Sequence, residues 1–262
     1  MNALRQVDGW PCENVAVCVA GTAAATYGAV DHPFAWASVT KLATAVAVLV
    51  AAEEGIVDLD GPAGPPGSTV RHLLAHASGL PFEGGAPIAK PGERRIYSNA
   101  GFDVVGQHVG EQAEMDFADY FEAVWGFTLD GSPGRGVRAS LEPLLALADE
   151  LLRPSRLAVE TFDEAISVQF PGLEGVLPGY GRMAPNDWGL GFELRNGKQP
   201  HWTGTLNSPR TFGHFGASGT FLWVDPDAGL ALGVLTDLEF GDWAKEAWPR
   251  LADAVLEEAV AR

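Results

Sequence analysis

Lysine is scarce in this chain of 262 residues, which contains only four lysines, and lysine and arginine together number 17 against 34 acidic residues. The formal net charge of −17 argues against a nucleic-acid surface, which needs clustered basic residues, and disfavours anionic membranes. The two cysteines, Cys12 and Cys18, are too few for a disulfide framework. Cys18 lies in an apolar stretch, so we expect a small core residue there.

Long apolar runs are absent as well. The longest, Leu42 to Ala52, is too short to cross a bilayer. Residues 1–21 contain no basic segment followed by an apolar stretch, so we identify no signal peptide and expect a cytoplasmic protein. A hydrophobic content of 47% with dispersed glycine and proline is typical of a globular protein.

The pattern of apolar residues predicts strands near both ends of the chain and helices between them. The predicted strands are Val15–Ala20, Ala23–Val30, Thr211–Phe215, Gly219–Val224 and Leu230–Thr236. The predicted helices are Ser38–Glu54, Val70–His76, Phe102–Glu111, Asp116–Ala123, Leu141–Leu152 and Trp243–Arg262.

This order predicts an α+β fold, with one antiparallel sheet formed from both chain termini, flanked by helices, and an inserted helical lobe. We expect one unit over residues 1–262, made of an α/β lobe (1–70 with 186–262) and a mostly helical lobe (71–185). A cleft between two such lobes is where small-molecule sites preferentially form.

The strongest chemical signal is Ser38-Val39-Thr40-Lys41, which stands immediately before the longest apolar run. A serine at a helix start directs its hydroxyl toward the positive end of the helix dipole, and a lysine three residues later can reach that hydroxyl. Burial of Lys41 would lower its pKa and supply a neutral amine base. The alternative is an N-capping serine followed by a lysine that extends to solvent.

Two further motifs follow in the chain. Tyr97-Ser98-Asn99 stands between a loop and a predicted helix, and Gly213-His214-Phe215-Gly216-Ala217 places a histidine and a glycine at a strand end. Glycine at such a position lets a ligand approach the backbone closely.

The ordered set Ser-x-x-Lys, Tyr-x-Asn and a late His-x-Gly resembles the penicillin-recognising serine hydrolases, most closely the branch of class C β-lactamases, D,D-peptidases and their esterase relatives. The segments 72–80, 91–99 and 188–192 look similar to that branch, and the resemblance spans residues 15–240. It implies a β-lactamase/transpeptidase-like fold.

The resemblance also implies a role for each matching residue. Ser38 would be the acylated nucleophile, and Lys41 and Tyr97 would share the general acid and base work. Asn99 would bind the substrate's carbonyl or amide group, and the backbone N–H groups of Ser38 and Ala217 would form the oxyanion hole. With Gly216, His214 would complete the third motif, in which β-lactamases usually carry lysine and many esterases and peptidases carry histidine.

Competing signals are weaker. His72 and His76 are spaced for zinc on a helix, but no glutamate completes a metalloprotease motif, so we expect a structural role. Ser218 near His214 could suggest another nucleophile, but Gly216-Ala217-Ser218-Gly219-Thr220 lacks the second glycine of a nucleophile elbow. Trp188, Trp202 and Trp223 could line a cleft, although core positions are the commoner outcome, and we expect Asp187 and Asp225 to be solvated or capping residues.

We therefore expect a serine hydrolase that acts through a Ser38 acyl-enzyme on a small ester, amide or lactam, with carboxylesterase ahead of β-lactamase and D-amino-acid peptidase. The alternative is a non-catalytic ligand-binding protein with the same fold. The mechanism needs no metal or cofactor, and we expect a small-molecule partner, with no nucleic acid and no membrane. No feature of the sequence indicates an oligomeric state.

Overall fold

The computed structural model describes residues 1–261, which form two compact units. Unit 1 comprises residues 1–39, 138–155 and 195–262, and unit 2 comprises residues 40–137 and 156–194. The predicted lobes, 1–70 with 186–262 and 71–185, divide the chain differently and stay a prediction. Within residues 1–261, no helix combines the length and the apolar character that a membrane span requires.

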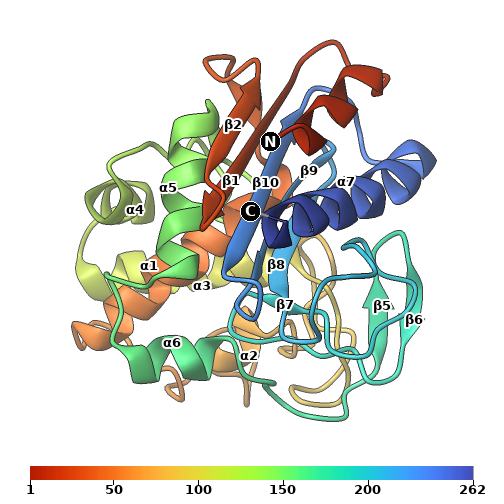
Figure 1. Ribbon diagram of the computed structural model, residues 1–262. Helices are drawn as coiled ribbons and strands as arrows, with labels where there is room; N and C mark the ends of the chain where they lie inside the picture. Colours follow the sequence, from red (N-terminus) through yellow and green to blue (C-terminus); the bar gives the residue numbers. More distant parts are fainter. Residues whose placement is uncertain (262) are drawn as a thin grey trace. The chain divides into compact units, whose positions relative to one another are not determined.

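Unit 1 is built on an antiparallel sheet to which both ends of the chain contribute (Figure 1). Its strands lie in the order β2 (Ala25–Gly28), β1 (Val15–Gly21), β10 (Leu230–Thr236), β9 (Thr220–Asp225) and β8 (Phe212–Gly216). Each neighbouring pair is antiparallel. The predicted α+β class and the predicted sheet are thus confirmed.

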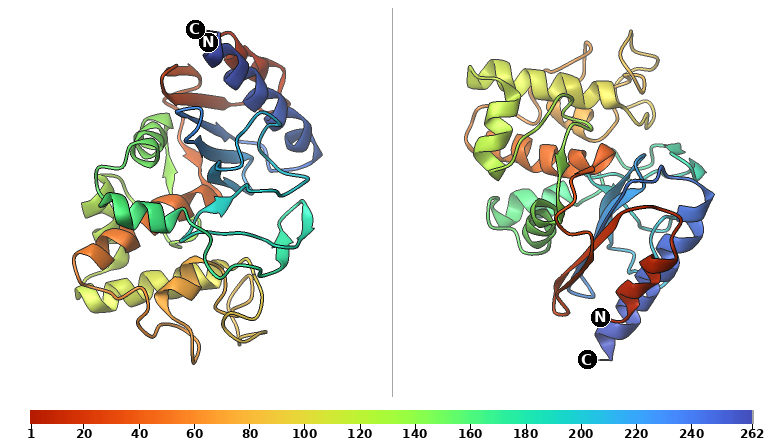
Figure 2. Two further views of the ribbon diagram at one scale, coloured as in Figure 1. Left: turned by 60° about the horizontal axis from the view of Figure 1, so that its bottom comes forward. Right: turned by 90° about the horizontal axis from the view of Figure 1, so that it is seen from above.

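Helices cover both faces of this sheet, which explains why β1 and β10 are almost continuously apolar (Figure 2). Helix α5 (Leu141–Leu152) packs on β1 and β10, with Leu144 against Gly233. Helix α7 (Asp242–Val260) covers the other face, where Trp248 lies 5.0 Å from the ring centre of Phe221. The N-terminal 3-10 helix η1 (Ala3–Gly9) packs on α7.

Ser38 lies among short elements of unit 1. The strand β3 (Phe34–Ala35) pairs with β4 (Arg138–Ala139), and the 3-10 turn η2 (Ala37–Val39) follows β3. Ser38 was predicted to begin the helix that ends near Glu54, but it lies in this 3-10 turn, and the α-helix begins two residues later. The positive φ of Ala37, 46°, lies outside the right-handed helical region, so the α-helix cannot extend back through Ala37.

Unit 2 is mostly helical and contains only short strands. Its elements are α1 (Thr40–Glu53), α2 (Val70–Leu74), α3 (Asn99–Ala113), α4 (Phe117–Trp125), α6 (Val159–Ala165), β5 (Gly175–Leu177), β6 (Gly181–Met183) and β7 (Glu193–Leu194). Helix α1 is apolar on nearly every side and packs against α3 and α4. Such a helix is stable only when it is buried all round, and this burial includes Lys41.

Candidate active site

Lys41 stands in the first turn of α1 and is completely buried. Its Nζ atom donates one hydrogen bond to Oδ1 of Asn99 at 2.6 Å and another to the backbone oxygen of Gly134 at 2.8 Å. It also lies 4.9 Å from the ring centre of Tyr97 and 5.3 Å from that of Phe102. Unit 2 thus brings together three residues of the predicted site, Lys41, Tyr97 and Asn99.

Burial lowers the pKa of Lys41 to about 7, because the charged form loses its hydration in this apolar helix. The negative charges of Asp103 and Glu83 oppose this effect, and the positive charge of Arg135 adds to it. A neutral amine has two N–H groups and one lone pair. Both of these acceptors are uncharged, so a neutral lysine can donate to each of them, and a neutral amine can take up a proton.

A polar chain extends from Lys41 to the surface of unit 2. Asn99 begins α3, and its Nδ2 atom donates to Oε1 of Glu83 at 3.0 Å. The same carboxylate oxygen accepts a hydrogen bond from Arg135 at 2.6 Å. Because Asn99 accepts from Lys41 and donates to Glu83, the two contacts define the orientation of its carboxamide.

Aromatic contacts position Tyr97. Its ring centre lies 4.7 Å from that of His76, 5.8 Å from that of Phe82 and 5.9 Å from that of Trp188. The imidazole Nδ1 of His76 accepts a hydrogen bond from the backbone N–H of Ser98, the residue next to Tyr97. His76 therefore holds the Tyr97 segment in place through a ring contact with Tyr97 and a hydrogen bond to the next residue.

Ser38, Gly216 and Ala217 lie in unit 1, where hydrogen bonds join the turn η2 to the β8–β9 turn. The backbone oxygen of Trp36 accepts from Val39 N at 3.1 Å and from the Thr220 hydroxyl at 2.9 Å. The Ser218 hydroxyl donates to the Ala35 oxygen at 2.7 Å. The segment that carries Ser38 is thereby held beside the residues that follow β8.

Gly216 makes this close approach possible. A Cβ atom at this position would lie 2.5 Å from the Thr220 hydroxyl oxygen, 2.7 Å from the Trp36 oxygen and 3.0 Å from the Ala37 Cβ. His214, also on β8, is buried, and its Nδ1 lies 2.7 Å from the Phe215 backbone oxygen.

Comparisons with known proteins identify the family of this chain. The beta-lactamase family matches residues 14–126 and 122–257. A solved beta-lactamase from Mycobacterium bovis is 52% identical, with 98% of this chain and 99% of that chain covered and a TM-score of 0.96. The chain belongs to the beta-lactamase family.

More distant members of this fold have different recorded activities. The simvastatin synthase of Aspergillus terreus is 18% identical over 97% of this chain and 96% of that chain, with a TM-score of 0.80. EstCE1, described as a hydrolase with promiscuous acyltransferase activity, is 17% identical over 97% and 96%, with a TM-score of 0.75. A comparison with curated proteins gives no match. The beta-lactamase family is a serine hydrolase family, and these two proteins share its fold.

The competing sequence signals have structural explanations in this beta-lactamase-family chain. His76 lies beyond the end of α2 with a φ of 55°, so it does not share a helix face with His72. Within residues 1–261, no group of three histidine, cysteine, aspartate or glutamate side chains could hold a metal ion.

Several other residues singled out from the sequence lie in the core or make capping contacts. Trp188, Trp202 and Trp223 are buried, as is Cys18, whose thiol pKa burial raises to about 12. Asp225 accepts hydrogen bonds from the backbone and hydroxyl of Ser208, as expected for a capping residue.

Sequence reasoning missed Gly134, Glu83 and Arg135. None of them belongs to the three motifs, and 93 residues separate Gly134 from Lys41. Their only signal in the sequence is a position in a Gly/Pro-rich loop, which does not reveal a contact.

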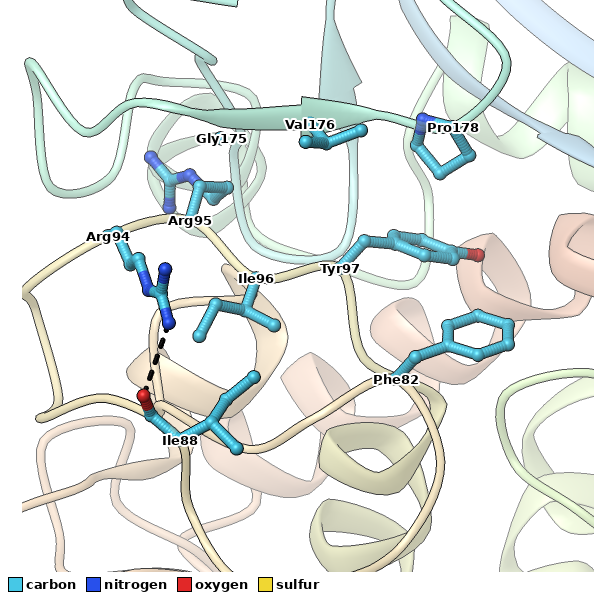
Figure 3. A pocket seen from close by; sticks show the side chains of 9 residues that line it. All are labelled: Phe82, Ile88, Arg94, Arg95, Ile96, Tyr97, Gly175, Val176 and Pro178. Carbon is cyan, nitrogen blue, oxygen red and sulfur yellow. Dashed lines mark hydrogen bonds between the residues drawn. The ribbon is translucent and has the colours of Figure 1, made fainter. Parts of the chain in front are cut away.

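A cavity of about 480 Å³ lies in unit 2 beside Tyr97 (Figure 3). Most of its lining is apolar or backbone: the lining residues are Phe82, Ile88, Arg94, Arg95, Ile96, Tyr97, Gly175, Val176 and Pro178. Val176 and Pro178 come from the β5–β6 hairpin, which the sequence analysis did not predict. A cavity with this lining suits the apolar part of a small molecule.

Proposed function

We propose that this protein is a carboxylesterase-type serine hydrolase that acts through an acyl-enzyme on Ser38. The observation that carries the proposal is the buried Lys41, whose pKa is lowered to about 7 and whose hydrogen bonds to Asn99 and Gly134 reach uncharged acceptors. The turn η2 runs into α1 without a break, so Ser38 stands three residues before this amine in the chain. A hydroxyl with a neutral amine at this spacing is an activated nucleophile.

In the proposed reaction, the Ser38 hydroxyl oxygen attacks the ester carbonyl carbon, and its proton passes to Lys41, directly or through the Tyr97 hydroxyl. The N–H groups of Ser38 and Ala217 stabilise the negative oxygen. The bond to the alcohol then breaks, and the alcohol oxygen takes up that proton. Water then attacks the acyl carbon and gives one proton to the same base. The bond between this carbon and the Ser38 oxygen breaks, which releases the acid, and the Ser38 oxygen takes up that proton.

An ester substrate is supported by two observations. The cavity beside Tyr97 is largely apolar, as the acyl or alcohol part of an ester requires. His214 occupies the third-motif position in which the resemblance associates histidine with esterases and peptidases. A second candidate, β-lactam hydrolysis, is supported by the recorded name of the 52% identical M. bovis protein.

The decisive experiment is the intact mass of the protein after exposure to a fluorophosphonate probe. We expect one adduct on the wild type, none on Ser38→Ala, and one on Ser218→Ala, since the Ser218 hydroxyl donates to a backbone oxygen. An adduct retained by Ser38→Ala would assign the nucleophile to another residue. Saturable ester binding by the wild type with no adduct would favour the non-catalytic binding protein.

Turnover then separates the candidate reactions. Kinetics with nitrophenyl esters and with nitrocefin, a chromogenic cephalosporin, compare ester and lactam hydrolysis in one preparation. A higher kcat/KM for the esters is expected. A higher value for nitrocefin would replace the esterase proposal with the second candidate.

A further inference from the structure

Exposed apolar side chains gather around the cavity in unit 2. Seven large apolar residues are exposed within the described chain, and three of them, Phe82, Ile88 and Val176, line this one cavity. Their exposed fractions are 52%, 57% and 59%. Scattered apolar residues on a surface need no explanation, but a group around a cavity marks a binding site for apolar groups.

Arg94 lies at one end of this cavity, and Tyr97 with Phe82 lies at the other (Figure 3). The Arg94 side chain is exposed, and its Nη2 donates to the backbone oxygen of Ile88 at 3.2 Å. Across residues 1–261 it forms no ion pair, although the chain has twice as many acidic as basic residues. The guanidinium therefore keeps most of its donors for a ligand.

Two carboxylates, Glu93 and Glu174, are adjacent in sequence to residues that line the cavity, and both already have partners. Glu93 accepts a hydrogen bond from the Lys90 backbone at 3.0 Å, and Glu174 pairs with Arg182.

The second arginine of the cavity, Arg95, is buried and donates to the backbone oxygens of Ala75, Gln169 and Asn186. Its donors are committed to the fold, so Arg94 is the cation that the cavity presents to a ligand.

We propose that this cavity selects esters with an apolar arm that ends in a carboxylate, and that Arg94 binds this carboxylate. The inference rests on the proposed function, since it places the ester group at the Tyr97 end. Arg94 and Tyr97 are three residues apart, so their backbones lie at most about 10 Å apart, and an extended chain of about seven carbon–carbon bonds, as in suberate, falls within this limit. The preferred substrates are therefore half-esters of dicarboxylic acids with about eight carbon atoms.

The test compares two substrates that differ only at the far end of the arm, p-nitrophenyl hydrogen suberate and p-nitrophenyl octanoate. We expect the wild type to prefer the suberate in kcat/KM by about tenfold, the scale of a hydrogen-bonded charge pair. Arg94→Gln should abolish this preference by lowering kcat/KM for the suberate about tenfold more than for the octanoate, and Arg94→Lys should restore part of it. Arg210→Gln, which removes an exposed arginine paired with Asp227, is the matched control.

Equal losses on both substrates in Arg94→Gln would assign Arg94 a structural role and overturn the inference, as would a preference that survives the substitution. If the wild type hydrolyses neither ester, the proposed function fails, and the cavity is tested separately by calorimetric titration of Ser38→Ala with monomethyl suberate and methyl octanoate. Tighter binding of monomethyl suberate that is lost with Arg94→Gln would support the site, and equal binding would reject it.

Discussion

The Nζ atom of Lys41 donates a hydrogen bond to Oδ1 of Asn99 at 2.6 Å, in a region from which solvent is excluded. Neither Asn99 nor the other acceptor, the Gly134 backbone oxygen, carries a charge. The nearest charges act from further away, and they partly cancel in their effect on the Lys41 pKa. The amine is therefore governed by its burial, which gives several measurable consequences.

The rate of ester hydrolysis should rise with pH through about 7. Burial lowers the pKa of Lys41 to about that value, and only the neutral amine can accept the Ser38 proton. The measurement is kcat/KM for a nitrophenyl ester between pH 5 and 9. Lys245→Met, which removes an exposed lysine beside Asp242, should keep the same profile. A rate that is flat across pH 7 would rule out Lys41 as the base.

The stability of the wild type should rise with pH relative to Lys41→Met. The folded-state pKa of about 7 lies below the ordinary value of 10.5, so between these values the unfolded chain binds more protons than the folded one. The free energy of unfolding then increases with pH over this window, and the cost of burying a charged amine, fully present below pH 7, disappears near pH 10.5. Urea unfolding at pH 7 and pH 10 checks this, and an equal difference between the two proteins at both pH values would contradict it.

Glu83→Gln and Arg135→Gln should move the pH–rate profile in opposite directions. Both side chains meet at one carboxylate oxygen, and Asn99 connects that carboxylate to Lys41. The negative charge of Glu83 raises the pKa of Lys41, and the positive charge of Arg135 lowers it. Removal of the glutamate charge should therefore shift the midpoint to lower pH, and removal of the arginine charge to higher pH. Shifts of the same sign would show that these residues act only through the position of Asn99.

Tyr97→Phe should lower kcat by at least about a hundredfold, the usual contribution of a positioned acid or base. The ring contacts with His76, Phe82 and Trp188 do not involve the hydroxyl, so the variant should keep these contacts and stay folded, which thermal unfolding checks. Tyr27→Phe, which removes an exposed hydroxyl bonded to Asp8, serves as the control. If Tyr97→Phe retains full activity while Lys41→Ala does not, the amine alone is the base.

The sequence predicts the elements of this fold well wherever the apolar pattern is local. The strand β10 and the helix α5 have their predicted bounds, because the apolar pattern of each ends at a turn or at a capping position. The helix α6 and the hairpin β5–β6 were not predicted, since both are short and their stability depends on tertiary contacts.

The same distinction applies to the candidate site. Ser38, Lys41, Tyr97 and Asn99 lie within short motifs whose spacing carries the chemistry. The oxygen that accepts from Lys41 belongs to Gly134, and the carboxylate that orients Asn99 belongs to Glu83. A backbone carbonyl has no signature in the sequence, and the Glu83–Arg135 pair joins residues 52 positions apart. Only the folded chain reveals these partners.

Gly216→Ala should destabilise the protein and slow acylation of Ser38 together. The new Cβ would meet the backbone oxygen of Trp36 at 2.7 Å, and this carbonyl belongs to the segment that carries Ser38. A clash with backbone is relieved only by movement of η2 or β8, and overpacking of this kind costs about 1–3 kcal/mol. Urea unfolding and the rate of fluorophosphonate labelling measure the two effects.

The control for Gly216→Ala is Gly9→Ala, because a Cβ at Gly9 would meet no atom within 4 Å. That variant should match the wild type in both measurements. A Gly216→Ala protein that is destabilised but labelled at the wild-type rate would show that β8 moves to relieve the clash while η2, which carries Ser38, keeps its position. The acylating serine would then be independent of the contact between Gly216 and Trp36, contrary to the positioning inferred from their geometry.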